Sequence, residues 1–80
     1  MGKFQKAIAA FSKGLETQPT YFYAYWRRGL SYEGLGDIEN AQRDYRKGYE
    51  VGIEDLGEEF FDYMDIYPEV EKKLVQDWDS

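Results

Sequence analysis

The sequence predicts an all-α domain built from antiparallel pairs of short helices. Apolar residues recur at steps of three and four along most of the chain, which is the spacing of one helix face. Signals typical of helix ends separate these stretches, at Pro19, at residues 34–36 and at Pro68. The chain also repeats itself after 34 residues, so that Gly2, Ala7, Phe11, Lys13 and Gly14 return as Gly36, Ala41, Tyr45, Lys47 and Gly48.

Residues 3–15 form the first predicted helix. Lysines lie mostly outside its apolar stripe, which consists of Phe4, Ala7, Ile8, Phe11 and Leu15. Pro19 then ends the helical stretch, because a proline disfavours helical geometry at the residue before it. Thr20 is placed to cap the helix that follows.

The second helix is expected over about residues 21–33, and the third over about residues 38–51. The turn between them contains the glycines needed for a left-handed helix ending, and Asp37 can cap the third helix. The two helices therefore form a hairpin.

Small residues mark the faces on which these two helices meet. Gly29 lies in the second helix, and Ala41 and Gly48 lie in the third, on the same face as Tyr45. A glycine inside a helix costs roughly 1 kcal/mol relative to alanine, so we expect backbone proximity to compensate at these positions.

The 34-residue pattern is lost after Gly52, so no third standard repeat is expected. An apolar stripe continues all the same, and Pro68 is suited to a first helical turn. The residues of the two stripes are Leu56, Phe60, Tyr63, Met64 and Tyr67, then Val70, Leu74, Val75 and Trp78. We expect two further helices that cap the repeat, because a stacked array needs an end that meets water.

Composition excludes several classes of function. The chain has no cysteine and no histidine, which removes disulfides, thiolate nucleophiles, serine-histidine triads and the common zinc sites. No apolar run reaches the roughly 20 residues that span a bilayer. We expect a soluble, cytoplasmic protein that does not bind membranes.

Charge is distributed unevenly along the chain. The net charge is −6, and residues 1–50 carry eight basic and six acidic side chains, whereas residues 51–80 carry two and ten. An acidic protein repels phosphate backbones, so nucleic-acid binding is not expected. A short basic patch of Arg43, Arg46 and Lys47, partly offset by Asp44 and Glu50, is interpreted as a polar face.

The repeat resembles the tetratricopeptide repeat (TPR) family, whose period is 34 residues. Tyr25, Gly29 and Tyr32 are similar to the first-helix pattern of that family, and Ala41 and Tyr45 to its second-helix pattern. The resemblance implies a half repeat over residues 1–19, a full repeat over 20–53 and capping helices over 54–80. It also implies repeat-packing roles for Ala7, Phe11, Tyr25, Gly29, Tyr32, Ala41, Tyr45 and Gly48.

The resemblance further implies a non-catalytic scaffold whose first helices line a groove for a protein or peptide. The residues that would line it here are Tyr23, Trp26, Arg27, Leu30 and Glu33. Trp26 and Arg27 are the predicted anchors, because aromatic and arginine side chains dominate interface energetics. A second interpretation stays open, in which Trp26 packs on the C-terminal helices.

No metal or cofactor is expected. Glu58, Glu59, Asp62 and Asp65 lack the ligand spacing of a calcium loop and are interpreted as a solvated face. An enzyme is disfavoured, because nothing places an acid, a base and an oxyanion stabiliser together.

Self-association is also predicted, because the first predicted helix lacks its usual partner helix. A homodimer would cover it through Phe4, Ile8 and Phe11. In the alternative hypothesis the chain is the C-terminal part of a longer array, with a mainly structural role.

Overall fold

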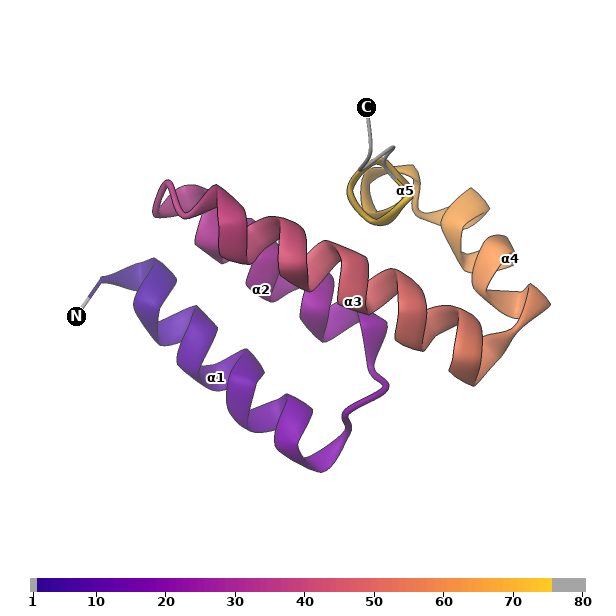
Figure 1. Cartoon of the computed structure of the whole chain (residues 1–80), viewed down its shortest axis with the longest axis horizontal. Coiled ribbons are helices and arrows are strands. Elements are labelled where there is room, and N and C mark those ends of the chain that lie inside the picture. The colour runs from indigo at the N-terminus through magenta and orange to yellow at the C-terminus, as the bar shows by residue number, and fades with distance from the viewer. Residues whose placement is uncertain (1, 76–80) are drawn as a thin grey trace.

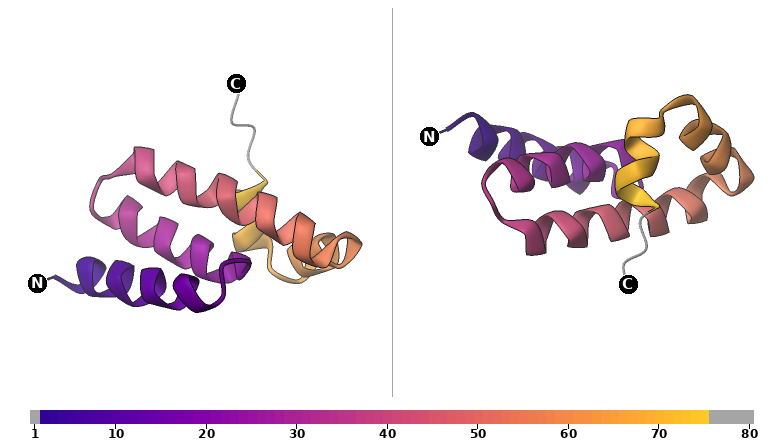
Figure 2. Two further views of the ribbon diagram at one scale, coloured as in Figure 1. Left: turned by 60° about the horizontal axis from the view of Figure 1, so that its bottom comes forward. Right: turned by 90° about the horizontal axis from the view of Figure 1, so that it is seen from above.

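The computed structural model describes residues 2–75 and folds them into five α-helices, which confirms the all-α prediction. The helices are α1 (Lys3–Thr17), α2 (Phe22–Gly34), α3 (Ile38–Leu56), α4 (Glu58–Ile66) and α5 (Pro68–Leu74). The first three run side by side in alternating directions (Figure 1). The last two fold back, so that α5 crosses over α2 and α3 (Figure 2).

The hairpin turn between α2 and α3 forms as the sequence predicts. Gly36 has a φ of 80°, a left-handed conformation that glycine adopts without steric cost. The side chain of Asp37 caps α3, because its carboxylate accepts hydrogen bonds from the backbone and side-chain nitrogens of Asn40, at 3.3 and 2.7 Å.

α3 is longer than predicted. It continues through Gly52 and ends at Leu56, where Gly57 follows with a φ of 59°. Gly52 lies inside the helix, and its missing side chain makes room for the ring of Phe60 on α4. The sequence holds two candidate glycines here, and the left-handed backbone of the helix end is at Gly57.

α1 packs on α2 alone among the described helices. Leu15 is buried, whereas Ala7, Ile8 and Phe11 are half-buried and Phe4 is 40% exposed. The ring of Phe4 lies against Gly34 at the end of α2. The apolar stripe of α1 is therefore covered on one side only.

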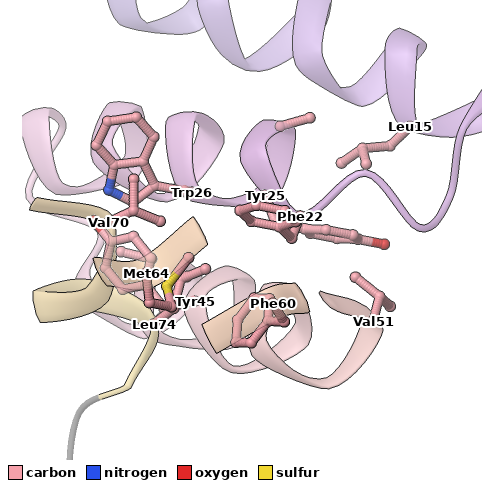
Figure 3. Packing of buried hydrophobic residues seen from close by; sticks show 12 residues of the cluster. Leu15, Phe22, Tyr25, Trp26, Tyr45, Val51, Phe60, Met64, Val70 and Leu74 are labelled. Atoms are coloured by element: carbon pink, nitrogen blue, oxygen red, sulfur yellow. The ribbon is translucent and has the colours of Figure 1, made fainter. Parts of the chain in front are cut away.

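The core lies between α2, α3 and the two C-terminal helices (Figure 3). Its largest fully buried side chains come from α3, α4 and α5, and they are Tyr45, Phe60, Met64, Leu74 and Val70. Four of these five belong to the region after Gly57. α4 and α5 therefore complete the core, and the predicted Trp78 lies outside the described residues.

The predicted repeat-packing residues lie at the contact between α1, α2 and α3. Ala7, Phe11 and Tyr32 are half-buried, and a larger group is buried, namely Tyr25, Gly29, Ala41, Tyr45 and Gly48. At Gly29 the close neighbour is a side chain, because a Cβ there would lie 2.8 Å from Cδ1 of Tyr45. At Gly48 the neighbours include backbone, the carbonyl oxygen of Phe22 at 3.4 Å.

Candidate binding surface

The outer face of α2 is divided between exposed and covered residues. Tyr23 is 38% exposed, Arg27 is exposed and Leu30 is half-buried. Trp26 is only 8% exposed, and Glu33 forms an ion pair with Lys73 of α5 at 2.9 Å. The five predicted groove residues thus share one helix but do not form one open surface.

Trp26 packs in the core next to α5. Its indole belongs to the same buried cluster as Val70 of α5 (Figure 3), and its ring centroid is 5.2 Å from that of Tyr23. The indole Nε1 is buried and has no hydrogen-bond partner among the described residues. This arrangement corresponds to the second interpretation of Trp26, in which it packs on the C-terminal helices.

Arg27 lies on the side of α2 that faces α1. Its guanidinium carbon is 5.9 Å from the ring centroids of both Phe11 and Trp26. Such contacts with aromatic faces hold a cation at the surface while its outer edge stays in water. Arg27 and Tyr23 are the two predicted groove residues whose side chains are exposed.

The adjacent arginine, Arg28, joins three helices, a role that the sequence does not predict. Arg28 forms a two-pronged pair with Asp44 of α3, with distances of 2.7 and 2.6 Å, and also donates to the hydroxyl of Ser12 on α1 at 3.0 Å. The hydrogen bonds with Asp44 raise the pKa of Arg28 above its ordinary value. Asp44 therefore joins α2 to α3 and does not offset the basic patch on α3, which corrects that interpretation.

Tyr45 lies next to the ion pair between Glu33 and Lys73, which joins α2 to α5. Its ring centroid is 5.7 Å from Nζ of Lys73. Burial raises the pKa of Tyr45 above its ordinary value, and the nearby carboxylate of Glu33 raises it further. This polar contact at the edge of the core holds α5 across α2.

A groove opens at the end of the molecule where the loop between α1 and α2 approaches α4 and α5. Its cavity volume is about 790 Å³. It is lined by Thr17, Gln18, Pro19, Thr20, Tyr21, Phe22, Tyr23, Asp55, Leu56, Tyr63, Tyr67 and Val70. We call this the tyrosine groove, and its volume falls within the range of about 300–1,000 Å³ typical of ligand sites.

The tyrosine groove contains every exposed tyrosine of the described chain, namely Tyr21, Tyr23, Tyr63 and Tyr67. They form two stacked pairs. The centroids of Tyr21 and Tyr23 are 6.0 Å apart, and those of Tyr63 and Tyr67 are 6.5 Å apart with the planes inclined by 13°. The sequence does not predict this site, because only chain folding brings residues 21–23 beside residues 63–67.

The described part of the chain shows neither a cluster of metal ligands nor a helix that could cross a membrane. Residues 2–75 contain no group of three or more acidic, histidine or cysteine side chains arranged to hold a metal ion. The acidic residues of α4, namely Glu58, Glu59, Asp62 and Asp65, are exposed. Within the same residues, no helix has the length and apolar character to cross a membrane.

Comparison with known proteins identifies the central hairpin. Residues 22–51 match the family model of the tetratricopeptide repeat, which confirms the resemblance drawn from Tyr25, Gly29 and Tyr32. The matched span begins with α2 and ends within α3. The searches of curated proteins and of solved structures returned no significant match.

Proposed function

We propose that this chain, whose residues 22–51 are a tetratricopeptide repeat, is a non-catalytic module that binds a protein or peptide and also associates with itself. The repeat indicates a scaffold for protein interaction. The observation that carries the proposal is the gathering of all four exposed tyrosines of the described chain in one groove. Aromatic side chains of this kind are enriched in binding surfaces, because they bring a large contact area at a low cost in conformational entropy.

The proposed partner surface extends from the tyrosine groove along the exposed side of α2. Tyr23 belongs to both, and Arg27 lies one helical turn further on. An arginine held over aromatic rings can form a forked pair with a carboxylate of the partner. Trp26 contributes by supporting Tyr23 and Arg27 from below, since its ring contacts both.

Partner binding is tested by affinity purification with quantitative mass spectrometry of the bound proteins. We expect Tyr23→Ala and Arg27→Glu each to reduce recovery of the same protein by about tenfold, which corresponds to a loss of about 1.4 kcal/mol of binding free energy. Lys47→Glu is the matched control, because Lys47 is exposed on α3 and lies outside this surface. Equal recovery with all three variants would remove α2 as the partner surface.

Self-association is proposed through the uncovered side of α1. Phe4, Ile8 and Phe11 are only partly covered by α2, and no other described helix contacts α1. A second copy that packs on this stripe would form a closed, two-fold symmetric dimer, the commonest oligomer.

Light scattering across a concentration series tests the dimer. The expected mass approaches twice the 9.5 kDa of one chain. Ile8→Lys is expected to return the chain to a monomer, whereas Ala10→Lys, which places the same charge on an exposed position of α1, leaves the dimer intact. A wild-type mass of one chain at every concentration would reject self-association.

A second candidate role is structural, as the end of a longer array. The burial of α5 against the repeat supports it, since capping helices close the core of such arrays. The discriminating observation is whether the coding sequence continues upstream in frame with further 34-residue units. A cytoplasmic location is proposed because the absence of cysteine suits a reducing compartment, and cell fractionation tests it.

A further inference from the structure

The tyrosine groove presents aromatic rings and hydroxyl groups with little charge. Besides the four tyrosines, its lining includes Pro19, and Phe22 packs edge-on against Tyr63 with centroids 5.9 Å apart. Each tyrosine hydroxyl can donate one hydrogen bond and accept others. A ligand that offers compact apolar groups together with exposed acceptors therefore suits this surface.

Asp55 is the one charged side chain in the lining of the groove. The surrounding region is acidic as well, because residues 51–75 carry eight acidic side chains and only two lysines. One of these lysines, Lys73, is paired with Glu33. A basic group on the ligand would meet both a carboxylate and the faces of tyrosine rings, which also attract cations.

We infer that the tyrosine groove binds an extended, proline-rich segment of a partner protein that places an arginine or lysine against Asp55. The inference rests on the proposed function, since it names the chemistry of the partner. It also adds a site most of whose lining residues lie outside the matched repeat.

Two features favour a proline-rich ligand, namely the absence of a sheet edge in the described chain and the presence of tyrosine rings and hydroxyl groups in the groove. The described residues include no strand, so no sheet edge is available to pair with an added β-strand. A polyproline II segment needs no such pairing, because its carbonyl groups point outward and proline has no N–H to satisfy. Tyrosine hydroxyls can donate to those carbonyls while the rings pack on the pyrrolidine groups. Such a segment is also stiff before binding, which lowers the entropy lost on docking.

Fluorescence anisotropy with a labelled synthetic peptide tests the inference. The probe is a peptide of about ten residues that alternates proline pairs with leucine and begins with one arginine, long enough for about three turns of polyproline II. We expect saturable binding with a dissociation constant below about 1 mM, which is the weak end of specific association. A peptide with alanine for proline and one with glutamate for arginine should each bind about tenfold more weakly.

Variants of the chain locate the site. Tyr67→Ala and Tyr21→Ala, from opposite sides of the groove, should each weaken binding about tenfold, and Asp55→Lys should remove the preference for arginine over glutamate. Ile66→Ala is the matched control for Tyr67, because Ile66 is 66% exposed and lies outside the lining. Circular dichroism confirms that each variant is folded.

The inference is overturned if the arginine peptide has a dissociation constant above about 1 mM. It is also overturned if the peptide with alanine for proline binds equally well. It is also overturned if the Tyr67 and Tyr21 variants both bind like the wild type. Any of these results leaves the proposed function standing as long as Tyr23→Ala still reduces recovery of a protein partner. If recovery is also unchanged, the proposed function fails separately.

Discussion

Replacement of Gly52 by alanine tests the tertiary contact that determines where α3 ends. Alanine favours a helix over glycine by roughly 1 kcal/mol, so local propensity alone predicts a more stable protein. In the structure, however, a Cβ at Gly52 overlaps Cδ1 and Cε1 of Phe60 and lies 3.2 Å from its Cζ. The two effects therefore have opposite signs, and the tertiary contact decides between them.

The magnitude follows from how tightly the Phe60 ring is held. Phe60 is fully buried, and its ring packs edge-on against Phe22 and Tyr49, with centroids 5.3 and 5.7 Å away. A ring enclosed in this way cannot move aside without disturbing the core, and overpacking of a core costs about 1–3 kcal/mol or more. A Cβ at Gly52 would overlap two atoms of this ring, so we expect an overpacking cost in the upper part of this range. After subtraction of the helix gain, Gly52→Ala is expected to lower the free energy of unfolding by about 2 kcal/mol.

Gly14 provides the matched control. It also lies within a helix, α1, but a Cβ there has no neighbour within 4 Å. Gly14→Ala is therefore expected to raise the free energy of unfolding by about 0.5–1 kcal/mol.

The assay is urea unfolding followed by far-UV circular dichroism, with a thermal melt beside it. For a domain of this size, a loss of about 2 kcal/mol corresponds to a fall in Tm of roughly 8–16 °C. If Gly52→Ala is as stable as the wild type, or gains stability as Gly14→Ala does, the ring of Phe60 does not lie on α3 and α4 does not pack there.

Three further predictions concern the contacts that hold the helices together. Asp44→Asn should lower the free energy of unfolding, measured in urea, by about 2 kcal/mol, because it breaks a mostly buried charge pair. Glu39→Gln removes an exposed pair and should lower it by less than about 0.5 kcal/mol. Leu74→Ala should cost about 2–5 kcal/mol, because it opens a cavity beneath the fully buried end of α5, and Val75→Ala, at a position 43% exposed, should cost much less. The third prediction is a pH dependence, because the folded state holds the proton of Tyr45 more tightly than the unfolded chain does. The free energy of unfolding should be constant below pH 10.0, the ordinary pKa of tyrosine. Above that pH it should fall by up to about 1.4 kcal/mol per pH unit. Tyr45→Phe should remove that part of the alkaline loss.

Each of these predictions has a result that would contradict it. Equal costs for Asp44→Asn and Glu39→Gln would show that Arg28 does not join α2 to α3. Equal costs for Leu74→Ala and Val75→Ala would show that α5 is not docked. An alkaline unfolding curve identical in Tyr45→Phe and the wild type would mean that this hydroxyl is not desolvated on folding.

The helices of the repeat were predictable because their signals are local. Apolar spacing, Pro19, the glycines before Asp37 and the position of Pro68 all act over a few residues, and each ends or begins a helix as expected. The third helix was the exception, because both Gly52 and Gly57 were suitable endpoints by local criteria. In the structure Gly57 takes the left-handed conformation that ends the helix, whereas Gly52 lies within the helix against the ring of Phe60, eight residues further on.

The surface was less predictable than the fold. Arg27 and Arg28 are identical residues side by side, yet one is exposed and the other is paired with Asp44. Trp26 and Tyr23 share a helix face, yet α5 covers one and leaves the other exposed. In each pair the difference depends on a neighbour from a distant part of the sequence.

The sequence by itself determined the class of this protein, because a 34-residue period and helical apolar spacing are properties of neighbouring residues along the chain. The tertiary structure alone decided which residues face water. α5 crosses α2 and buries Trp26, and the fold-back of α4 brings Tyr63 and Tyr67 beside Tyr21 and Tyr23. The physical reason is that helix formation depends on short-range geometry, whereas burial depends on which apolar faces remain to be covered once all the helices have formed.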